Sequence, residues 1–274
     1  MYKRQTANTL YKAQEENTDV YYFAGQDTES TPINNWVKFG KFQNDLIRYR
    51  GYYRTTSTSY YEYSTMDECT SASIANINCT EYKYANTGDD IYWRIIRTNS
   101  DGSVRLLYAG TSPDTTTGNI GKSAFNSTIN SPKYVGYKYG EDTSLDTIRN
   151  NTTDSTIKTY VDNWYKNNLT AYTKYISTEA VYCNDRELAP GSTYNTGNTS
   201  FSYATKGRLN TNKTPTYNCA NIKDAFSGSN SEAKLTYPIG LMTADEVSFA
   251  GGVCFKYAKA WSWYNNNSVN GSST

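Results

Sequence analysis

The chain has 274 residues, a formal net charge of +1 and no histidine. A charge this close to neutral excludes the basic surface that nucleic-acid partners usually require, and no run of 18 apolar residues is present that could span a bilayer. Without histidine, the chain lacks the Ser-His-Asp and Cys-His catalytic arrangements and the commonest metal ligand.

Tyrosine is the most unusual part of the composition, with 28 residues beside 5 tryptophans. A tyrosine ring can be buried while its hydroxyl finds a hydrogen-bond partner, so we expect a globular domain with tyrosine in its core and on its surface. Two explanations stay open. One is a paratope-like surface of Tyr, Ser, Gly and Asn; the other is the codon bias of an AT-rich genome.

The first five residues, MYKRQ, are the translation of ATG TAT AAG AGA CAG, which resembles a transposon-end adaptor used to build sequencing libraries. Sequence of this kind is set aside before fold reasoning. We therefore expect residues 1–19 to be an adaptor scar, at 1–5, followed by a disordered lead, at 6–19, that is polar and mildly helical.

Two short strands are predicted next, at Val20–Ala24 and Asn34–Phe39. The stretch from Leu46 to Glu81 is rich in Tyr, Ser and Thr and contains the first two cysteines. It is predicted to be an excursion from the main fold, closed by its own disulfide.

The clearest local pattern is Ile91–Ala109, where two β-rich runs flank an Asp-Gly dipeptide. Asp-Gly supports the positive φ angles of a tight turn, so a β-hairpin is predicted. Trp93, Ile95 and Arg97 fall on one side of the first run, which predicts one buried face.

In the second half, Lys133–Tyr139 is predicted to be a strand and Asp154–Leu169 a helix. Ser155 or Asp154 can cap this helix. Its apolar stripe has helical spacing and consists of Ile157, Val161, Trp164 and Leu169.

Three further segments follow. Pro190–Tyr203 is predicted to be a loop and Tyr237–Met242 an extended segment. Thr243 and Glu246 fit a capping box that opens a short helix, and this helix is expected to end at the glycine pair 251–252.

The hydrophobic residues of these elements are predicted to form one buried cluster. Its members are Trp36, Trp93, Ile95, Val104, Leu106, Val135, Trp164, Leu241 and Val247.

The 5 cysteines form no CxxC pair, so zinc and redox motifs are not indicated. In an Asn- and Thr-rich chain that looks extracellular, disulfides persist. We predict Cys69–Cys79 and Cys183–Cys219, worth about 3 and about 4 kcal/mol in the chain-entropy model. Cys254 is left over, as a free buried thiol or with a partner outside this sequence. Reduced cysteines in a cytosolic protein are the alternative.

Six segments together resemble an uncharacterised extracellular domain of surface proteins from low-GC gut bacteria. Their order and spacing carry the resemblance, over about three-quarters of the chain. The segments are NNWVKF (34–39), YWRIIRTNSDGSVRLLY (92–108), YVGYKY (134–139), IKTYVDNWYKNNL (157–169), CNDR (183–186) and YPIGLMTADEVSFAGG (237–252).

The resemblance implies an α+β fold similar to C-type-lectin-like folds, with an irregular mixed and antiparallel sheet, two helices and long loops. It implies a single domain over residues 20–264 and a disordered tail at 265–274. The family passes directly from its first segment to its second, so residues at about 41–90 are an insertion. The family also continues with further strands, so the closing strands are expected to be missing and the chain to be truncated at its C-terminus.

One group of candidate ligand contacts is Asn184, Asp185 and Arg186. These residues follow Cys183, whose disulfide would fix them as a polar site. The alternative is an Asp–Arg pair that caps a loop.

A second group is Trp261, Trp263 and Tyr264, which could stack on sugar rings or could be core positions of a strand. Asp89 and Asp90 make calcium possible but unsupported, because one acidic pair without further oxygen ligands is a weak site. No cofactor is predicted.

The leading hypothesis is a non-enzymatic, secreted or wall-exposed bacterial module for adhesion, which binds a glycan or a protein ligand. One alternative is a structural or pilin-like surface subunit. Another is an enzyme related to the formylglycine-generating branch of lectin-like folds, for which Cys254 is the candidate residue. We expect no nucleic-acid partner and no membrane-spanning segment in this sequence.

Overall fold

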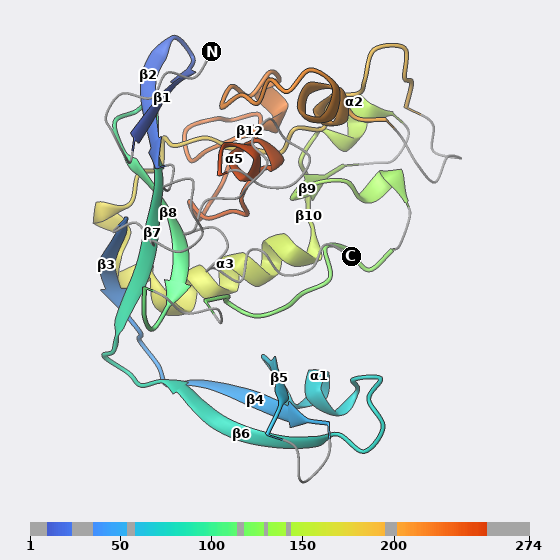
Figure 1. Cartoon of the computed structure of the whole chain (residues 1–274). Coiled ribbons are helices and arrows are strands. Elements are labelled where there is room, and N and C mark those ends of the chain that lie inside the picture. The colour runs from blue at the N-terminus through green and yellow to red at the C-terminus, as the bar shows by residue number, and fades with distance from the viewer. Residues whose placement is uncertain are drawn as a thin grey trace.

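The structure is a computed structural model, and it is a mixed α+β arrangement of mostly antiparallel sheets with few helices (Figure 1). The coarse fold class expected from the sequence is therefore confirmed. The residues that the structure describes are 10–23, 35–53, 58–113, 118–128, 131–140, 144–194 and 202–250.

Strands are the main elements of the described residues. They are β1 (Leu10–Glu15), β2 (Thr18–Phe23), β3 (Trp36–Lys41), β4 (Leu46–Tyr52), β5 (Tyr60–Tyr63), β6 (Asn78–Ala85), β7 (Asp90–Thr98), β8 (Val104–Gly110), β9 (Lys138–Tyr139), β10 (Thr153–Asp154), β11 (Tyr182–Cys183) and β12 (Ala225–Phe226).

Most helices are short. The α-helices are α1 (Met66–Thr70), α2 (Leu145–Ile148), α3 (Thr156–Asn168), α4 (Ala204–Lys206) and α5 (Ala244–Phe249). Tighter or wider helical turns are η1 (Pro132–Tyr134), η2 (Thr170–Tyr175), η3 (Gly207–Thr211) and η4 (Ile222–Asp224).

The main sheet is built around β7, which pairs antiparallel with β3 and β8 and, through Arg97 and Tyr22, with β2. The predicted β7–β8 hairpin is confirmed, but the prediction of one buried face is wrong. Trp93 and Arg94 point to opposite faces of the strand, and both are buried. The reason is that β7 is central and packed on both faces, and a register shift near Ile95 also breaks the alternation.

The described part of the N-terminal lead is a β-hairpin, so the helical tendency predicted for 6–19 is wrong. β1 and β2 pair along their whole length, and Asn17 in the turn has a φ angle of 68°. Tyr11 and Tyr22 stack across the hairpin with ring centroids 5.4 Å apart. Such cross-strand aromatic pairs stabilise a sheet and outweigh the weak helix preference. Residues 1–9 lie outside the described part.

A second sheet, ordered β5-β4-β6, projects from the main body in Figure 1. We call it the small sheet. Helix α1 packs against it, and the Cys69–Cys79 disulfide joins this helix to β6, with Cα atoms 6.1 Å apart. The predicted bridge is therefore confirmed.

Helix α3 confirms the prediction for Asp154–Leu169. The Ser155 side chain caps it by accepting a 3.1 Å hydrogen bond from the backbone N–H of Lys158, and Val161 and Trp164 are buried. The second predicted helix is also present as α5, with both hydrogen bonds of its capping box.

The strand predicted over Lys133–Tyr139 is present only at its end. The segment begins as the turn η1, and only β9 pairs with another strand, β10. Gly136 lies between η1 and β9 and has a φ angle of 95°, which interrupts the extended conformation.

Two main hydrophobic clusters replace the single predicted one. Trp93 and Trp164 are buried together as expected, but Trp36, Val104 and Leu241 are 37%, 48% and 43% exposed. Trp36 begins β3 and Val104 follows the hairpin turn, where few neighbours cover a side chain. The first cluster is Tyr11, Ala13, Val20, Tyr22, Ile96, Tyr217, Phe249 and Ala250; the second is Phe42, Ala85, Ile91, Trp93, Tyr108, Trp164, Tyr165 and Leu169.

Candidate functional site

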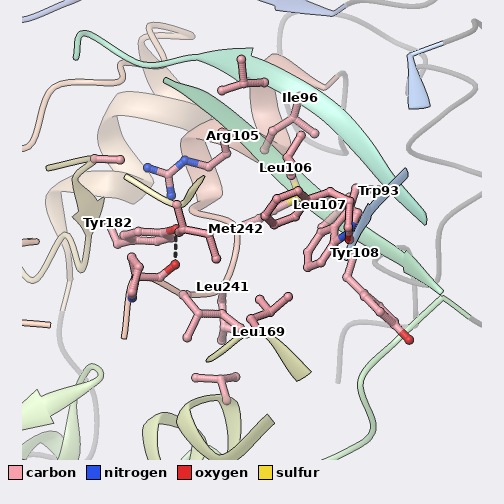
Figure 2. A pocket seen from close by; sticks show the side chains of 18 of the residues that line it. Trp93, Ile96, Arg105, Leu106, Leu107, Tyr108, Leu169, Tyr182, Leu241 and Met242 are labelled. Atoms are coloured by element: carbon pink, nitrogen blue, oxygen red, sulfur yellow. Dashed lines mark hydrogen bonds between the residues drawn. The ribbon is translucent and has the colours of Figure 1, made fainter. Parts of the chain in front are cut away.

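A cavity of about 580 Å³ lies between the β7–β8 hairpin, α3 and the segment 238–242. We call it the apolar groove, because aromatic and aliphatic side chains form most of its walls. Figure 2 shows how they converge on it from different elements. Its size and lining are those of a binding site for an apolar group. Labelled wall residues include Trp93, Leu106, Tyr108, Leu169, Leu241 and Met242.

The groove follows the outer edge of β8. Leu106 and Leu107 are consecutive and point to opposite faces of the strand, yet both line the groove. Within the described residues β8 pairs with β7 alone, so its other edge carries no strand partner there. An edge of this kind is a template for a further strand.

Two buried polar atoms belong to the walls of the groove. The hydroxyl of Tyr108 and the indole nitrogen of Trp164 have no hydrogen-bond partner among the described residues, although each side chain is only 8% exposed. Burial raises the pKa of Tyr108, so its hydroxyl stays protonated. Buried donors without acceptors are uncommon in folded proteins and costly.

One end of the groove is charged. Arg105 lies over the ring of Tyr182, 4.0 Å from its centroid, and its Nε is 3.5 Å from a carboxylate oxygen of Glu246. The same oxygen accepts a 3.1 Å hydrogen bond from Nε of Arg97, which also pairs with Glu15 at 3.0 Å. Four charged groups from β1, β7, β8 and α5 therefore meet in the interior.

This charged cluster is internally balanced. Burial would raise the pKa of Glu246, but the positive charges of Arg105 and Arg97 outweigh it and hold the pKa below its ordinary value. Glu246 also accepts the backbone N–H of Thr243 in the helix cap at 3.0 Å. Every carboxylate oxygen of Glu246 is thus engaged, and the cluster fixes α5 against the main sheet.

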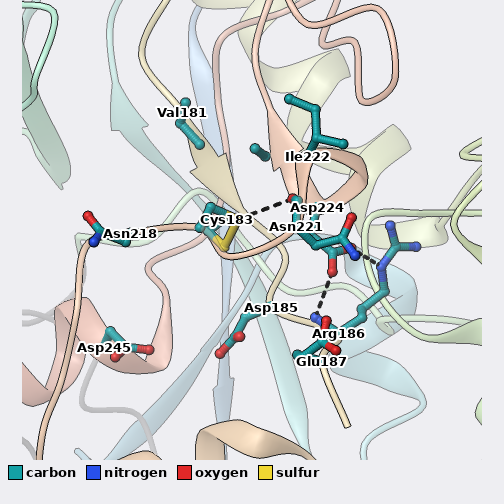
Figure 3. Close-up of a disulfide and its surroundings, with 12 residues drawn as sticks. Val181, Cys183, Asp185, Arg186, Glu187, Asn218, Asn221, Ile222, Asp224 and Asp245 are labelled. Carbon is teal, nitrogen blue, oxygen red and sulfur yellow. Dashed lines mark hydrogen bonds and ion pairs between the residues drawn. A yellow bond between two sulfur atoms is a disulfide. The ribbon is translucent and has the colours of Figure 1, made fainter. Parts of the chain in front are cut away.

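The predicted Cys183–Cys219 disulfide is confirmed, with Cα atoms 5.5 Å apart (Figure 3). It lies beside the first group of candidate ligand residues. Arg186 is 1% exposed and bonds Asp224 through Nε at 2.6 Å. Its other nitrogens donate to the backbone oxygen of Lys138 at 2.6 Å and to Asn151 at 2.9 Å. The structure gives its guanidinium an internal role and leaves none of its surface for a ligand.

The other two residues of that group also face protein atoms. Asp185 pairs with Arg208 at 2.5 Å instead of with its neighbour Arg186. Asn184 packs on Gly136, where an added Cβ would lie 2.0 Å from the Asn184 amide. The three residues lie together beside the Cys183–Cys219 disulfide, but their side chains contact other loops of the protein.

The second group, Trp261, Trp263 and Tyr264, lies outside the described residues. The acidic pair considered for calcium has other partners. Asp90 pairs with Lys38 and Lys41 at 2.8 Å each, and both lysines lower its pKa to about 2. In the described part of the chain, no group of three or more Cys, Asp or Glu residues could hold a metal ion.

A tyrosine-rich surface on the small sheet is the other candidate site. In register, Tyr52 lies opposite Tyr60, Arg50 opposite Glu62, and Arg48 opposite Tyr82. Side chains at such positions share one face of a sheet. We call it the tyrosine–arginine face, made of Arg48, Arg50, Tyr52, Tyr60, Glu62, Asn78, Thr80 and Tyr82.

Cations and rings alternate along this face. The guanidinium of Arg50 lies between two rings, 4.6 Å from the centroid of Tyr60 and 3.9 Å from that of Tyr82. Tyr82 donates a 2.6 Å hydrogen bond to Glu62, and burial together with this bond raises its pKa. Tyr60 is 42% exposed. The rings are thus held in place while part of their surface meets solvent.

The opposite face of the small sheet is covered around Gly51, although Tyr61 on the same face is 59% exposed. An added Cβ at Gly51 would lie 2.5 Å from Ile77, 2.8 Å from Tyr63 and 2.9 Å from the sulfur of Cys69. Helix α1 and its disulfide therefore cover the part of this side around Gly51, while on the tyrosine–arginine face Tyr60, Asn78 and Thr80 are exposed and Arg48 is buried.

Sequence reasoning missed the groove, the charged cluster and the tyrosine–arginine face. The last of these had a signal, since Arg48, Arg50 and Tyr52 alternate with period two, as one face of a strand does. The charged cluster had none, because Arg97 and Glu246 are 149 residues apart.

The chain matches no protein-family model, no curated protein and no solved structure. Among the helices of the described ranges, none is long and apolar enough to cross a membrane.

Proposed function

We propose that this chain is a non-catalytic recognition module of a bacterial surface protein, and that it binds a glycan through the tyrosine–arginine face. The observation that supports this most is the ladder of rings and cations on a small, disulfide-closed sheet. Tyrosine gives a large rigid contact area at a low entropic cost, and neighbouring small polar residues add adaptable hydrogen bonds.

A glycan fits the chemistry of this face better than an apolar ligand does. A sugar ring presents a C–H face and a rim of hydroxyls. Tyr60 offers an exposed ring for the first, and Asn78 and Thr80, both exposed on the same face, offer polar groups for the second. Arg50 and Glu62 add a donor and an acceptor beside the ring.

The proposal includes the compartment and the family. Two disulfides are consistent with an oxidising, extracellular location. We propose membership of the surface-protein family that the sequence resembles, with a C-type-lectin-like arrangement of the main sheet and α3. The small sheet is then the insertion that provides the ligand surface.

Glycan-array screening followed by calorimetry tests the proposal. The informative variant is Tyr60→Ala, with Tyr61→Ala as its matched control, because Tyr61 is adjacent, 59% exposed and on the opposite face. We expect at least about a tenfold loss of affinity for the first and little change for the second, since loss of a stacking contact costs on the order of 1.4 kcal/mol or more.

Equal losses from both variants, or no glycan bound by the folded chain, would overturn the proposal. Binding to mucin that survives removal of its glycans would indicate a protein ligand instead. Thermal melting of each variant separates a lost contact from a lost fold.

A further inference from the structure

Arg50 is held on the tyrosine–arginine face without a hydrogen bond from its guanidinium to any described residue. The nearest carboxylate oxygen belongs to Glu62 and is 3.8 Å from Nε, which is beyond hydrogen-bond distance. Nε is buried, but the side chain as a whole is 33% exposed. A guanidinium carries donors and no acceptor, so the terminal nitrogens of Arg50 have donors left for a ligand.

Two tyrosine rings hold this guanidinium in place. Its central carbon lies 4.6 Å from the ring centroid of Tyr60 and 3.9 Å from that of Tyr82. Arginine presents its donors as a planar fork, which matches two oxygens of one anionic group. Because the rings on both sides restrict the side chain before any ligand arrives, binding costs less conformational entropy.

The charges of the tyrosine–arginine face favour a negative ligand. Arg48, Arg50 and Glu62 are its charged residues, so positive charge is in excess. Glu62 is already engaged, because one oxygen accepts a 2.6 Å hydrogen bond from Tyr82 and the other is 3.9 Å from Nη1 of Arg48. Arg48 is buried and balances Glu62, which leaves the excess positive charge at the partly exposed Arg50.

We propose that the glycan bound by the tyrosine–arginine face is acidic, and that its carboxylate or sulfate group binds the terminal nitrogens of Arg50 beside the ring of Tyr60. This inference rests on the proposed function and narrows its ligand class. A neutral sugar offers Arg50 only hydroxyl oxygens, whereas an anionic group forms shorter and stronger charge-assisted hydrogen bonds. An anion also balances the excess positive charge of the face.

Pairs of glycans that differ only in charge test the proposal on the unaltered chain. Uronic-acid oligosaccharides are compared with their methyl esters, and sulfated oligosaccharides with their desulfated forms, by calorimetry. We expect the acidic member of at least one pair to bind at least about tenfold more tightly, since hydrogen bonds between charged groups are the stronger kind. The pair with the larger difference shows whether the anion is a carboxylate or a sulfate.

Substitutions at Arg50 locate the effect. Arg50→Gln should abolish the preference for the acidic member, and Arg50→Lys should reduce it, because an ammonium group lacks the planar fork. Lys83→Gln is the matched control. It removes the same charge from the opposite face of the small sheet, where Lys83 is 48% exposed, and should leave the preference unchanged.

Equal affinity within both pairs would overturn the proposal, and the proposed function would still stand if Tyr60→Ala weakened binding. If no glycan bound at all, both would fail. A preference that survives in Arg50→Gln, or that is lost equally in Lys83→Gln, would also overturn the role of Arg50. The comparison within each pair needs no variant, so it remains valid if a chain altered at Arg50 fails to fold.

Discussion

Trp93 on β7 and Trp164 on α3 meet edge to face, with ring centroids 6.0 Å apart and ring planes at 75°. Tyr108 on β8 completes the contact, at 5.6 Å from Trp93 and 5.1 Å from Trp164. Aromatic pairs in this geometry stabilise beyond the area they bury. The three rings are the main link between the sheet and its long helix.

Replacing Trp164 with alanine should therefore lower the free energy of unfolding by about 3–5 kcal/mol, the usual cost of removing a packed aromatic side chain. The control is Trp36→Ala, since this ring is 37% exposed and should cost below about 1 kcal/mol. Urea unfolding measures both. A loss under about 1 kcal/mol for Trp164 would mean that α3 is not held by these rings.

Removing the disulfide of the small sheet should act locally. In Cys69→Ser/Cys79→Ser we expect the small sheet to lose about 3 kcal/mol of stability. All 5 tryptophans lie outside residues 46–85, so none of their fluorescence comes from the small sheet. The unfolding midpoint of the main body should change little while hydrogen exchange in β4 to β6 accelerates. A large shift of the tryptophan transition would contradict this independence.

The charged cluster should make stability depend on acid. The pKa of Glu246 is lowered in the folded state, so its stabilising contribution is present above the ordinary pKa of about 4.3 and is lost as the pH falls through the folded value. Glu246→Gln should cost about 3–5 kcal/mol at pH 7, because it leaves buried arginine charge unbalanced. The exposed Glu232→Gln is the control. Measured at pH 3, the difference between Glu246→Gln and the unaltered chain should shrink; an equal cost at both pH values would contradict the ionic origin.

Two glycines allow the stability cost of backbone strain to be compared with the cost of a steric clash. Gly102 and Gly136 both have positive φ angles, 82° and 95°, but an added Cβ meets nothing at Gly102 and lies 2.0 Å from Asn184 at Gly136. Gly102→Ala should cost about 1 kcal/mol from strain alone. Gly136→Ala should cost clearly more. Similar melting temperatures for the two variants would show that the Asn184 loop yields freely.

Local patterns predicted the elements that local forces determine. The β7–β8 hairpin, α3 and the cap of α5 each depend on residues close in sequence, such as the turn before Ser103 or the Thr243 hydroxyl. Both disulfides were also predicted. The β1–β2 hairpin was missed because its cross-strand tyrosine pair decides its structure, and a polar helical pattern obscured it.

Burial was predicted less well, because it depends on which strand is central. Arg94 and Arg97 are both buried, although they fall on opposite sides of a strand for which one buried face was predicted, and their partners Asn35 and Glu15 lie far away in sequence. Among the candidate ligand residues, Arg186 was recognised as important for the wrong reason. Arg186 is a buried structural residue because it pairs with Asp224. This partner cannot be inferred from the residues close to Arg186 in sequence.

Strands β3 and β7 pair with each other, with Trp36 opposite Arg94. The whole small sheet, from β4 to β6, lies between these two strands in sequence. As the chain emerges during synthesis, β3 can pair only after β7 has been made, whereas β4, β5 and β6 find their partners within a few dozen residues. Local contacts form faster than distant ones. We expect the small sheet to be the first part to mature, with Cys69–Cys79 oxidised before Cys183–Cys219. Trapping thiols at successive times during oxidative refolding would reveal this order, and the small sheet, where a glycan is proposed to bind, would then be folded before the main body of the protein.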